Sequence, residues 1–451
     1  MISSLLAAAG RDAPQRAFLV DSIGVLSYAD ADQQASRMSA ALAARKMDRP
    51  AVFLPDSREL VVLLVAAARA GCEPCVLNRQ GGRDELATLY EHLGFDALIT
   101  DHAPGFGPET PIRLSELLAA VEPGTIEAAP DPTLVILTTG TTGLPKGARY
   151  RWASLVSQAR IRDDIAGTRW LLAYHLNHFA GLQMLVHVIA NRATIVLPAS
   201  PEIDAAVTAL VEHGVTHVSA TPTFWRLVLG RLDRATAHKL PLRQITLGGE
   251  ASSDELLKTL GDYFPEARIS HVFATTEVGS CFSVVDRERG FPLVVLERGP
   301  DADVQLKIVD GELWVRSRHG MLGYVGEPAD GEPGWRSTGD LVEITAGRVR
   351  FLGRASETIN VGGVKINPQP LEELVQGIPG VVMARAYGQP NPVTGRIVAL
   401  DVVAETGAAT DQLEASIRAA CRLLSRPAQP RSIRFVPSLE NTNRKILRRS
   451  T

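Results

Sequence analysis

Residues 133–150, TLVILTTGTTGLPKGARY, contain the pattern from which both the fold and the chemistry are best deduced. The apolar run Leu134 to Leu137 passes directly into four threonines and three glycines, among which stands Lys146. A short apolar run that ends in Gly and Thr predicts a buried strand that opens into a loop. Because glycine lets backbone N–H groups approach a ligand closely, this loop is suited to holding phosphate.

The loop differs from the familiar nucleotide-binding pattern G-x-x-x-x-G-K-[ST], in which a hydroxyl residue follows the lysine. Here Lys146 follows Pro145 and precedes Gly147. A flexible surface loop is the alternative interpretation, but the hydroxyl residues follow a buried strand directly. We therefore expect a phosphate-binding loop of a different kind.

Length and composition limit the class of protein. The chain has 451 residues, too many for one ordinary domain, which indicates two or three. Its net charge is −3 with acids and bases intermixed, which disfavours nucleic acid as a partner. The most apolar segment is interrupted by Arg69 and is shorter than the roughly 20 residues of a spanning helix. No convincing signal peptide begins the chain, so we expect a cytoplasmic protein without a membrane partner.

Two patterns that suggest metal or redox chemistry have a simpler interpretation. Cys72 and Cys75 form a C-x-x-C pair, but no second pair exists, which favours two buried structural thiols. His175 and His178 have metal-like spacing, yet no carboxylate or third histidine is near them in the sequence. A zinc site is therefore disfavoured.

Strand-like and helix-like segments alternate through the first 290 residues or so. Strands are expected at 49–55, 73–78, 215–222 and 243–249, with helices at 57–71, 203–214, 223–232 and 253–264. Ser57 is the expected N-cap of its helix. This alternation predicts doubly wound parallel sheets with helices on both faces, and ligands at the carboxyl ends of the strands.

The pattern changes after about residue 290. Segments 303–320 and 342–353 alternate like hairpins, with turns at Asp310-Gly311 and Ala346-Gly347. Beyond residue 357 the chain mixes strands and helices again over a length typical of a small domain. We expect an α/β protein with a large N-terminal domain (1–354) that includes a small β-rich subdomain, and a small α+β C-terminal domain (355–451).

Several polar clusters are ambiguous when taken singly. In HVFATTEVGS, Phe273 suits stacking on a base and Glu277 suits Mg²⁺, although such a stretch is more often core strand plus loop. Asp340 suits the hydroxyls of a ribose, although an isolated turn aspartate is the simpler explanation. The tail NRKILRR, with Lys445, resembles a solvated end. Their order and spacing are more informative than any one of them.

In that order, TTGTTGLPKG, ATTE, STGD, GRASETINVGG and NRKILRR resemble the motifs of the acyl-adenylate-forming superfamily. This superfamily includes acyl- and aryl-CoA ligases, adenylation domains of peptide synthetases and firefly-type luciferases. The resemblance covers nearly the whole chain, and it is closest to a short aryl- or acyl-CoA ligase. It implies that the C-terminal domain is mobile.

The resemblance implies a role for each matching position in the nucleotide site. The loop that grips the β- and γ-phosphates corresponds to Thr138, Thr139, Gly140, Thr141, Thr142, Gly143 and Lys146. The positions that contact adenine, the α-phosphate and Mg²⁺ correspond to Gly248, Gly249, Glu250, Phe273, Ala274, Thr275, Thr276 and Glu277. Among them, Glu277 matches the metal ligand. Asp340 matches the residue that binds ribose, and Arg354 the residue that contacts ribose and phosphate.

Further positions concern the acid and the second half-reaction. Lys445 matches a mobile catalytic lysine, which acts together with Thr276, Glu277 and Lys146. His178, with Gly248 and Phe273, matches the acid pocket, and Ser356 the hinge between domains. The thiol tunnel corresponds to Gly362, Gly363 and Lys365.

The function implied is ATP- and Mg²⁺-dependent conversion of a carboxylic acid to an acyl-AMP with release of pyrophosphate, followed by transfer to the thiol of CoA. Transfer to a carrier-protein phosphopantetheine, or to an amine or nitrite-type acceptor, remains an alternative, as does a non-catalytic nucleotide-binding homologue. Amino-acid-activating relatives place an Asp in the segment YHLNHFAGL, which has none here. An aromatic or short apolar acid without a free α-amine is therefore favoured; the oligomeric state, monomer or homodimer, stays open.

Four positions depart from the pattern of the superfamily. Ser356 replaces the usual Asp or Lys at the hinge, Arg444 replaces a Gly before the lysine, and Ala274 replaces a Gly. The usual Pro-x-Thr is absent from SLENTNRK. These departures concern the thiol half-reaction more than the phosphate loop.

Overall fold

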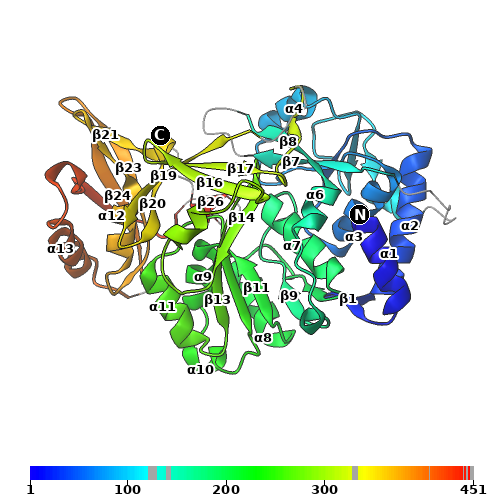
Figure 1. Cartoon of the computed structure of the whole chain (residues 1–451), viewed down its shortest axis with the longest axis horizontal. Helices are drawn as coiled ribbons and strands as arrows, with labels where there is room; N and C mark the ends of the chain where they lie inside the picture. The colour runs from blue at the N-terminus through cyan, green and yellow to red at the C-terminus, as the bar shows by residue number, and fades with distance from the viewer. Residues whose placement is uncertain are drawn as a thin grey trace.

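Two largely parallel sheets form most of the chain before Ala355. The computed structural model describes residues 1–119, 129–138, 144–327, 334–405, 407–439, 441–442 and 445–446 (Figure 1). The first sheet has eight strands in the order β14-β13-β12-β11-β9-β10-β1-β2, and only its edge strands β2 and β14 are antiparallel to their neighbours. Its strands are β1 Ala17–Asp21, β2 Gly24–Ser27, β9 Arg169–Leu171, β10 Thr194–Val196, β11 His217–Ala220, β12 Gln244–Gly248, β13 Arg268–Thr275 and β14 Gly279–Val284.

The second sheet contains the strand that leads into the phosphate loop. Its order is β18-β8-β7-β4-β3-β5-β6, and the five strands from β7 to β6 are parallel. The strands are β3 Pro50–Phe53, β4 Cys75–Val76, β5 Ala97–Thr100, β6 Ile112–Arg113, β7 Thr133–Thr138, β8 Lys146–Arg151 and β18 Gly323–Tyr324. The buried strand expected before the loop is thus β7, whose residues Leu134 to Leu137 are all buried.

Helices cover both sheets and pack between them. They are α1 Ile2–Asp12, α2 Tyr28–Ala44, α3 Arg58–Ala70, α4 Arg83–His92, α5 Leu114–Leu118, α6 Trp152–Ser157, α7 Phe179–Ala190, α8 Ile203–Glu212, α9 Pro222–Leu229, α10 Arg234–Ala237 and α11 Asp254–Tyr263, with short 3₁₀ turns η1 Asp163–Ile165 and η2 Leu293–Leu296. The Ser57 side chain accepts a hydrogen bond from the backbone N–H of Leu60, which confirms the expected N-cap of α3.

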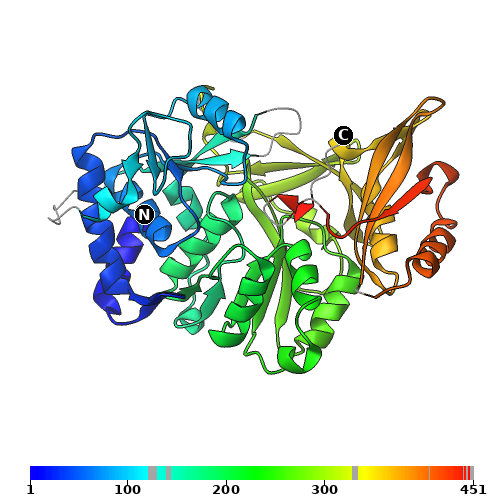
Figure 2. The same ribbon diagram turned by 180° about the vertical axis from the view of Figure 1, so that it is seen from behind.

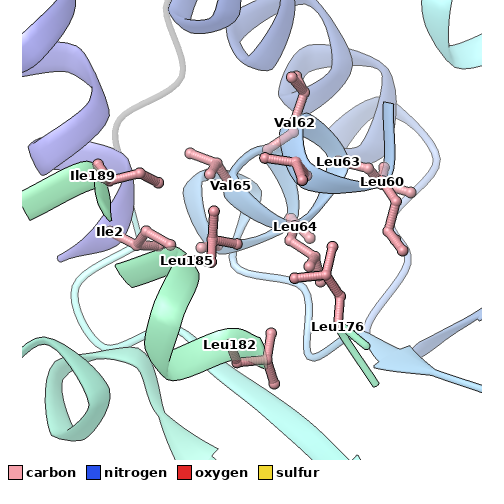
Figure 3. Packing of buried hydrophobic residues seen from close by; sticks show 14 of the residues in the cluster. Ile2, Leu60, Val62, Leu63, Leu64, Val65, Leu176, Leu182, Leu185 and Ile189 are labelled. Atoms are coloured by element: carbon pink, nitrogen blue, oxygen red, sulfur yellow. The ribbon is translucent and has the colours of Figure 1, made fainter. Parts of the chain in front are cut away.

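The largest core lies where α3 meets α1 and α7. Nine consecutive residues of α3, from Leu60 to Ala68, are buried. Figure 3 shows Leu64 and Val65 of this helix facing Leu185 of α7, with Ile2 of α1 beside them. A helix that is apolar on all sides needs such neighbours around its whole circumference, so this packing ties the two sheets together.

A five-stranded antiparallel sheet follows, as the hairpin patterns predicted. Its order is β15-β20-β19-β17-β16, with β15 Phe291–Pro292, β16 Val304–Val309, β17 Glu312–Ser317, β19 Arg336–Thr345 and β20 Arg348–Arg354. Asp310 and Gly311 have φ of 50° and 77°, and Ala346 and Gly347 have φ of 51° and 74°. Positive φ at both central residues is the geometry of a two-residue type I′ hairpin turn, so both expected turns are confirmed.

The last part of the chain forms a separate layer at one end of the molecule (Figure 1). It contains η3 Ala355–Glu357, β21 Ile359–Val361, β22 Val364–Ile366, α12 Pro368–Gln376, β23 Val381–Asn391, β24 Gly395–Ala404, α13 Thr410–Cys421, η4 Arg426–Ala428, β25 Ser432–Phe435, β26 Asn441–Thr442 and β27 Lys445–Ile446. Its core is drawn from this segment alone, from Ile359 to Phe435. Figure 2 shows the β26–β27 hairpin, in red, reaching back toward the middle of the molecule.

No helix among the described residues is long and apolar enough to cross a membrane.

Candidate active site

A cavity of about 1640 Å³ lies between the large N-terminal part and α12 of the C-terminal part. It borders the carboxyl ends of β7, β12 and β13, where ligands bind in sheets of this kind. The structure brings together in its lining most of the residues expected in the site: Thr138, His178, Gly248, Gly249, Glu250, Phe273, Ala274, Thr275, Thr276, Glu277, Asp340, Arg354 and Ser356. Of the phosphate loop, Thr139, Gly140, Thr141, Thr142 and Gly143 lie outside the described residues.

Asp340 and Arg354 form one wall of the cavity. They are partners across the β19–β20 hairpin, and Nε of Arg354 lies 3.1 Å from Oδ1 of Asp340. Oδ2 of Asp340 is buried and has no hydrogen-bond partner among the described residues. Burial raises the pKa of Asp340, and the neighbouring Arg354 opposes that rise. A buried carboxylate oxygen without a donor is suited to receiving hydroxyl groups from a ligand.

Glu277 faces a tyrosine that links it to the lysine of the phosphate loop. The Tyr324 hydroxyl donates a hydrogen bond of 3.3 Å to Oε1 of Glu277. The ring of the same tyrosine lies 4.7 Å from Nζ of Lys146, a cation–π contact. Burial, reinforced by the charge of Glu277, raises the pKa of Tyr324 to about 12. The tyrosine therefore stays protonated and holds a carboxylate and an ammonium group near one another.

Lys146 itself is available to an anionic ligand. Its side chain is 59% exposed, and within the described part of the chain it makes a single, long ion pair, 4.0 Å to Glu327. Thr138 and Lys146 are paired across β7 and β8 at the base of the loop. The loop therefore begins and ends on two hydrogen-bonded strands, which fixes the position of its base.

The ends of β12 and β13 form the floor. The Tyr174 hydroxyl donates a hydrogen bond of 2.9 Å to the backbone oxygen of Gly248, and a side chain at Gly248 would meet that hydroxyl at 3.2 Å. Glu250 accepts a hydrogen bond from the backbone N–H of Thr223. The ring of Phe273 packs parallel to Phe282 and Phe351, at 5.4 and 5.2 Å between centroids. Phe273 thus belongs to a cluster of stacked aromatic rings at the floor of the cavity.

A second part of the cavity lies along α7. His178, the N-cap of this helix, lines it together with Ala180, Gln183, Met184 and His187, which share one helical face. Opposite them the sheet presents hydroxyls of Ser219, Thr246 and Ser270. Burial, and secondly the charge of Arg160, lower the pKa of His187 to about 4, so it is neutral at physiological pH. This face of α7 carries no carboxylate that would pair with an ammonium group.

Lys445 and the residues expected to line a thiol tunnel occupy different surroundings. Strand β27, which begins at Lys445, lies against α9, whose first residues Pro222 and Thr223 line the cavity. Gly362, Gly363 and Lys365 belong to the β21–β22 hairpin and are not among the residues that line the cavity. The pose of the C-terminal part thus brings the lysine strand, and not this hairpin, toward the site. Arg444 lies outside the described residues.

The disfavoured metal and redox sites have structural explanations. Cys72 and Cys75 are buried and reduced, and burial raises the pKa of the Cys72 thiol to about 11. Nδ1 of His175 is bonded to Asp56 at 2.5 Å, and Asp56 also accepts the backbone N–H of Leu176. In the part of the chain that the structure describes, no three His, Cys, Asp or Glu residues gather as a metal site.

Sequence reasoning missed three residues of the site: Tyr174, Tyr324 and Gln183. Tyr324 lies 47 residues from the glutamate it contacts, and Tyr174 lies 74 residues from Gly248. No local pattern links such pairs. Gln183 could have been found, because it stands at helical spacing from His187 and from the N-terminal end of α7.

Comparison with known proteins identifies matching families over most of the chain. The model of the AMP-binding enzyme family matches residues 6–325, and that of the AMP-binding enzyme C-terminal domain matches residues 370–445. A 2-succinylbenzoate–CoA ligase of Lactococcus lactis subsp. lactis is 25% identical, with 97% of each chain covered. One of the plipastatin synthase proteins of Bacillus subtilis is 27% identical over 82% of this chain, which spans only 16% of that relative.

Solved structures share the fold. The o-succinylbenzoate CoA synthetase of Bacillus subtilis, in complex with an acyl-adenylate intermediate, has a TM-score of 0.79 at 24% identity, covering 98% of this chain and 96% of that one. The anthranilate CoA ligase AuaEII, in complex with anthranoyl-AMP, has a TM-score of 0.83 at 18% identity, covering 98% and 95%.

Proposed function

This chain belongs to the AMP-binding enzyme family, and on that premise we propose that it joins a carboxylic acid to the thiol of coenzyme A through an acyl adenylate. ATP is the co-substrate, and AMP and pyrophosphate are the products. The observation that supports this most is the cavity lined by Asp340 and Arg354, by Glu277, and by the ends of β12 and β13, with Tyr324 hydrogen-bonded to Glu277 from behind the lining. These groups suit ribose, phosphate and base respectively.

The first half-reaction joins two anions, and the site must offset their repulsion. A carboxylate oxygen of the acid attacks the α-phosphorus of ATP, an acyl–O–P bond forms, and the bond to the leaving pyrophosphate breaks. Lys146 stands at the base of the phosphate loop, where its ammonium can neutralise the leaving group. Lys445 is the group proposed to reach the carboxylate and the α-phosphate, because its strand lies against α9 at the cavity.

The described residues fit a nucleotide with its magnesium ion. Within the described part of the chain, Oδ2 of Asp340 has no hydrogen-bond donor, and ribose hydroxyls would supply one. Magnesium binds through one or two carboxylates together with substrate phosphates, and Glu277, oriented by Tyr324, offers one such carboxylate. When bound there, the ion would screen phosphate charge. For this, the carboxylate of Glu277 must be held in the correct orientation. The Tyr324 hydroxyl provides that orientation by donating a hydrogen bond to Oε1 of Glu277.

The second half-reaction requires a different position of the C-terminal domain. We assign residues 1–354 to the adenylation core and 355–451 to the mobile domain, with the hinge at Ser356 in η3. Support comes from the separate hydrophobic core of the C-terminal part and from the fact that Gly362 and Gly363 are not among the residues that line the cavity. Rotation about η3 would remove the Lys445 strand and bring this hairpin to the site.

The acid is proposed to be aromatic or short and apolar, without an α-amine. The α7 face that lines the cavity offers an amide, a thioether and a neutral imidazole, and the opposite wall offers three hydroxyls. None of these side chains would neutralise an ammonium group, whereas all tolerate an uncharged ring.

The test is pyrophosphate release from ATP with a panel of aryl and short-chain acids, including 2-succinylbenzoate and anthranilate. Parallel reactions with CoA, a holo-carrier protein and hydroxylamine identify the acceptor. We expect acid-dependent pyrophosphate and, with CoA, an acyl-CoA. Absence of pyrophosphate release with every acid would contradict the proposal. If pyrophosphate is released but the acyl group is transferred only to the carrier protein, then the carrier protein and not CoA is the acceptor.

A further inference from the structure

An ion pair joins the two parts of the molecule at the edge of the cavity. Nη1 of Arg289, in the segment between β14 and β15, lies 2.6 Å from Oε2 of Glu373 on α12. The exposed fractions of the two side chains are 33% and 19%, so water screens this pair only in part. Both residues line the cavity. The pair therefore bridges the large domain and the C-terminal domain beside the site.

Each partner is held in place by its own domain. The backbone N–H of Arg289 donates to Oδ1 of Asp254 at the start of α11, and its backbone oxygen accepts a hydrogen bond from Arg348. On the other side, Gln369 donates to Oε1 of Glu373 from one turn earlier on α12. Because both ends are already oriented, little side-chain freedom is lost when the pair forms.

The residues of α12 that border the cavity are polar. The cavity-lining residues of α12 are Gln369, Glu372, Glu373 and Gln376. The hydrophobic core of the C-terminal part does not extend across the border, because its members all come from that part. Helix α12 touches the large domain mainly at β20, where the side chain of Gln369 lies beside Gly353. A polar border of this kind permits relative motion of the two domains, so a single strong ion pair has a large influence on their arrangement.

The same border includes a partly buried arginine on α9, the helix that contacts the lysine strand. Arg226 on α9 donates to Oγ of Ser253, and burial lowers its pKa while Glu255, Glu250 and Glu373 oppose that effect. Strand β27 lies against this helix. Glu373 therefore faces positive charge from both Arg289 and Arg226 in the pose that places the Lys445 strand at the cavity.

We infer that Arg289 and Glu373 are a positioning pair, which holds the C-terminal domain in the pose that brings Lys445 to the acid and the α-phosphate. The inference rests on the proposed function. Neither residue needs to touch the reacting atoms. The pair would form in the adenylation pose and break when the domain rotates to admit the thiol.

The prediction that follows concerns the ratio of the two half-reactions. If the domain exchanges between two poses, one for each half-reaction, the rate of each is proportional to the population of its pose. Weakening the pair lowers the population for adenylation and raises the population for thiolysis. The ratio of the adenylation rate to the thiolysis rate then changes by the same factor as the equilibrium constant between the two poses. This holds whichever pose predominates.

The experiment measures pyrophosphate release with ATP and acid, and separately thiolysis of supplied acyl-AMP by CoA, in the wild type and in Arg289→Ala, Glu373→Gln and the double variant. We expect each single variant to lower the ratio of adenylation to thiolysis by about tenfold, equivalent to ~1.4 kcal/mol. The double variant should lower it no further, because either change alone removes the pair. High salt should lower the ratio in the wild type and have less effect in the variants.

Arg231→Ala is the matched control. It removes an ion pair of 2.6 Å with Asp204 that lies wholly within the large domain, so the ratio should not change. Spin labels on cysteines introduced at the exposed positions Val211 and Val393 report the arrangement of the two domains without any turnover. The four native cysteines are buried, so the labels attach at the two introduced sites. We expect Glu373→Gln to broaden the distance distribution.

The outcomes separate this inference from the proposed function. Suppose that the wild type releases pyrophosphate. The positioning role would then be overturned if Arg289→Ala and Glu373→Gln leave the ratio of adenylation to thiolysis and the spin-label distance distribution unchanged. Equal losses of both half-reactions would also overturn it, because a general structural defect does not favour one pose. A wild type that adenylates no acid would instead refute the proposed function, and the spin-label distances would still test whether the pair holds the domains.

Discussion

Arg354 Nε lies 3.1 Å from Oδ1 of Asp340, while Oδ2 of the same carboxylate is buried without a hydrogen-bond partner among the described residues. The β19–β20 hairpin sets the two residues directly opposite one another. One carboxylate oxygen is therefore occupied by an arginine and the other is available to a ligand. Burial raises the pKa of Asp340, and the charge of Arg354 on the occupied oxygen opposes that rise.

Asp340→Asn should weaken ATP binding and stabilise the protein without ligand. Burial raises the pKa of Asp340 in the folded protein above its value in the unfolded chain. Protonation of Asp340 therefore contributes to the free energy of unfolding at pH values below its unfolded pKa. This contribution is lost as the pH rises through its folded pKa. The ionised form of this buried group is thus a cost to stability, which asparagine removes. We expect KM for ATP to rise by about 10- to 100-fold and the melting temperature to increase.

Steady-state kinetics with ATP varied, together with thermal melts at pH 5 and pH 8, check this. The advantage of the asparagine variant should be larger at pH 8. A variant that melts lower than the wild type and keeps its KM for ATP would show that Asp340 is structural.

Lys146→Ala should impair ATP handling with little effect on folding. The side chain is 59% exposed, and among the described residues it makes a long ion pair of 4.0 Å and a cation–π contact with Tyr324, so its removal should change the free energy of unfolding by about 0.5 kcal/mol or less. KM for ATP should rise about tenfold or more, because a charge on the leaving phosphates is lost. Lys258→Ala, at an exposed lysine of α11, is the control. Equal kinetics in the two variants would argue against a role for Lys146.

Tyr324→Phe separates the ring from the hydroxyl. Phenylalanine keeps the cation–π contact with Lys146 but removes the hydrogen bond to Glu277. We expect kcat for adenylation to fall about tenfold with a smaller change in KM for ATP. Because the pKa of Tyr324 is raised to about 12, the pH–rate profiles of wild type and variant should run parallel between pH 7 and 10. A wild-type loss of rate near pH 10 that the variant lacks would contradict this arrangement.

Leu185→Ala tests the core that joins the two parallel sheets. The side chain is fully buried between α3 and α1, and its truncation should lower the free energy of unfolding by about 2–5 kcal/mol. Leu423→Ala, at a side chain that is 87% exposed, should have almost no effect. Urea unfolding of both variants measures the difference. Similar midpoints for the two would mean that the core relaxes around Leu185.

Local signals in the sequence predicted the elements well where one residue determines the geometry. Ser57 caps its helix, and Asp310-Gly311 and Ala346-Gly347 form the expected turns, because these positions depend on side-chain oxygens or on positive φ. The buried strand before the phosphate loop was predicted from its apolar run. The order of motifs predicted a set of site residues, most of which line one cavity in the structure.

Pairings between distant residues were not predictable. Tyr324 contacts Glu277, and Arg289 contacts Glu373 across 84 residues, through packing of elements that no local pattern relates. Asp340 and Arg354 were each expected in the site, but their ion pair depends on the register of a hairpin. The stacking of Phe273 on Phe282 and Phe351 likewise depends on three strands meeting.

We expect Lys445, in the C-terminal part of the chain, to act in the first half-reaction only. The most direct test of this expectation measures both half-reactions in Lys445→Ala: pyrophosphate release from ATP and acid, and thiolysis of supplied acyl-AMP. The strand of Lys445 lies against α9 at the cavity, so the account predicts a loss of adenylation of at least ~10²-fold with thiolysis unchanged. Equal loss of both half-reactions, or unimpaired adenylation, would contradict it.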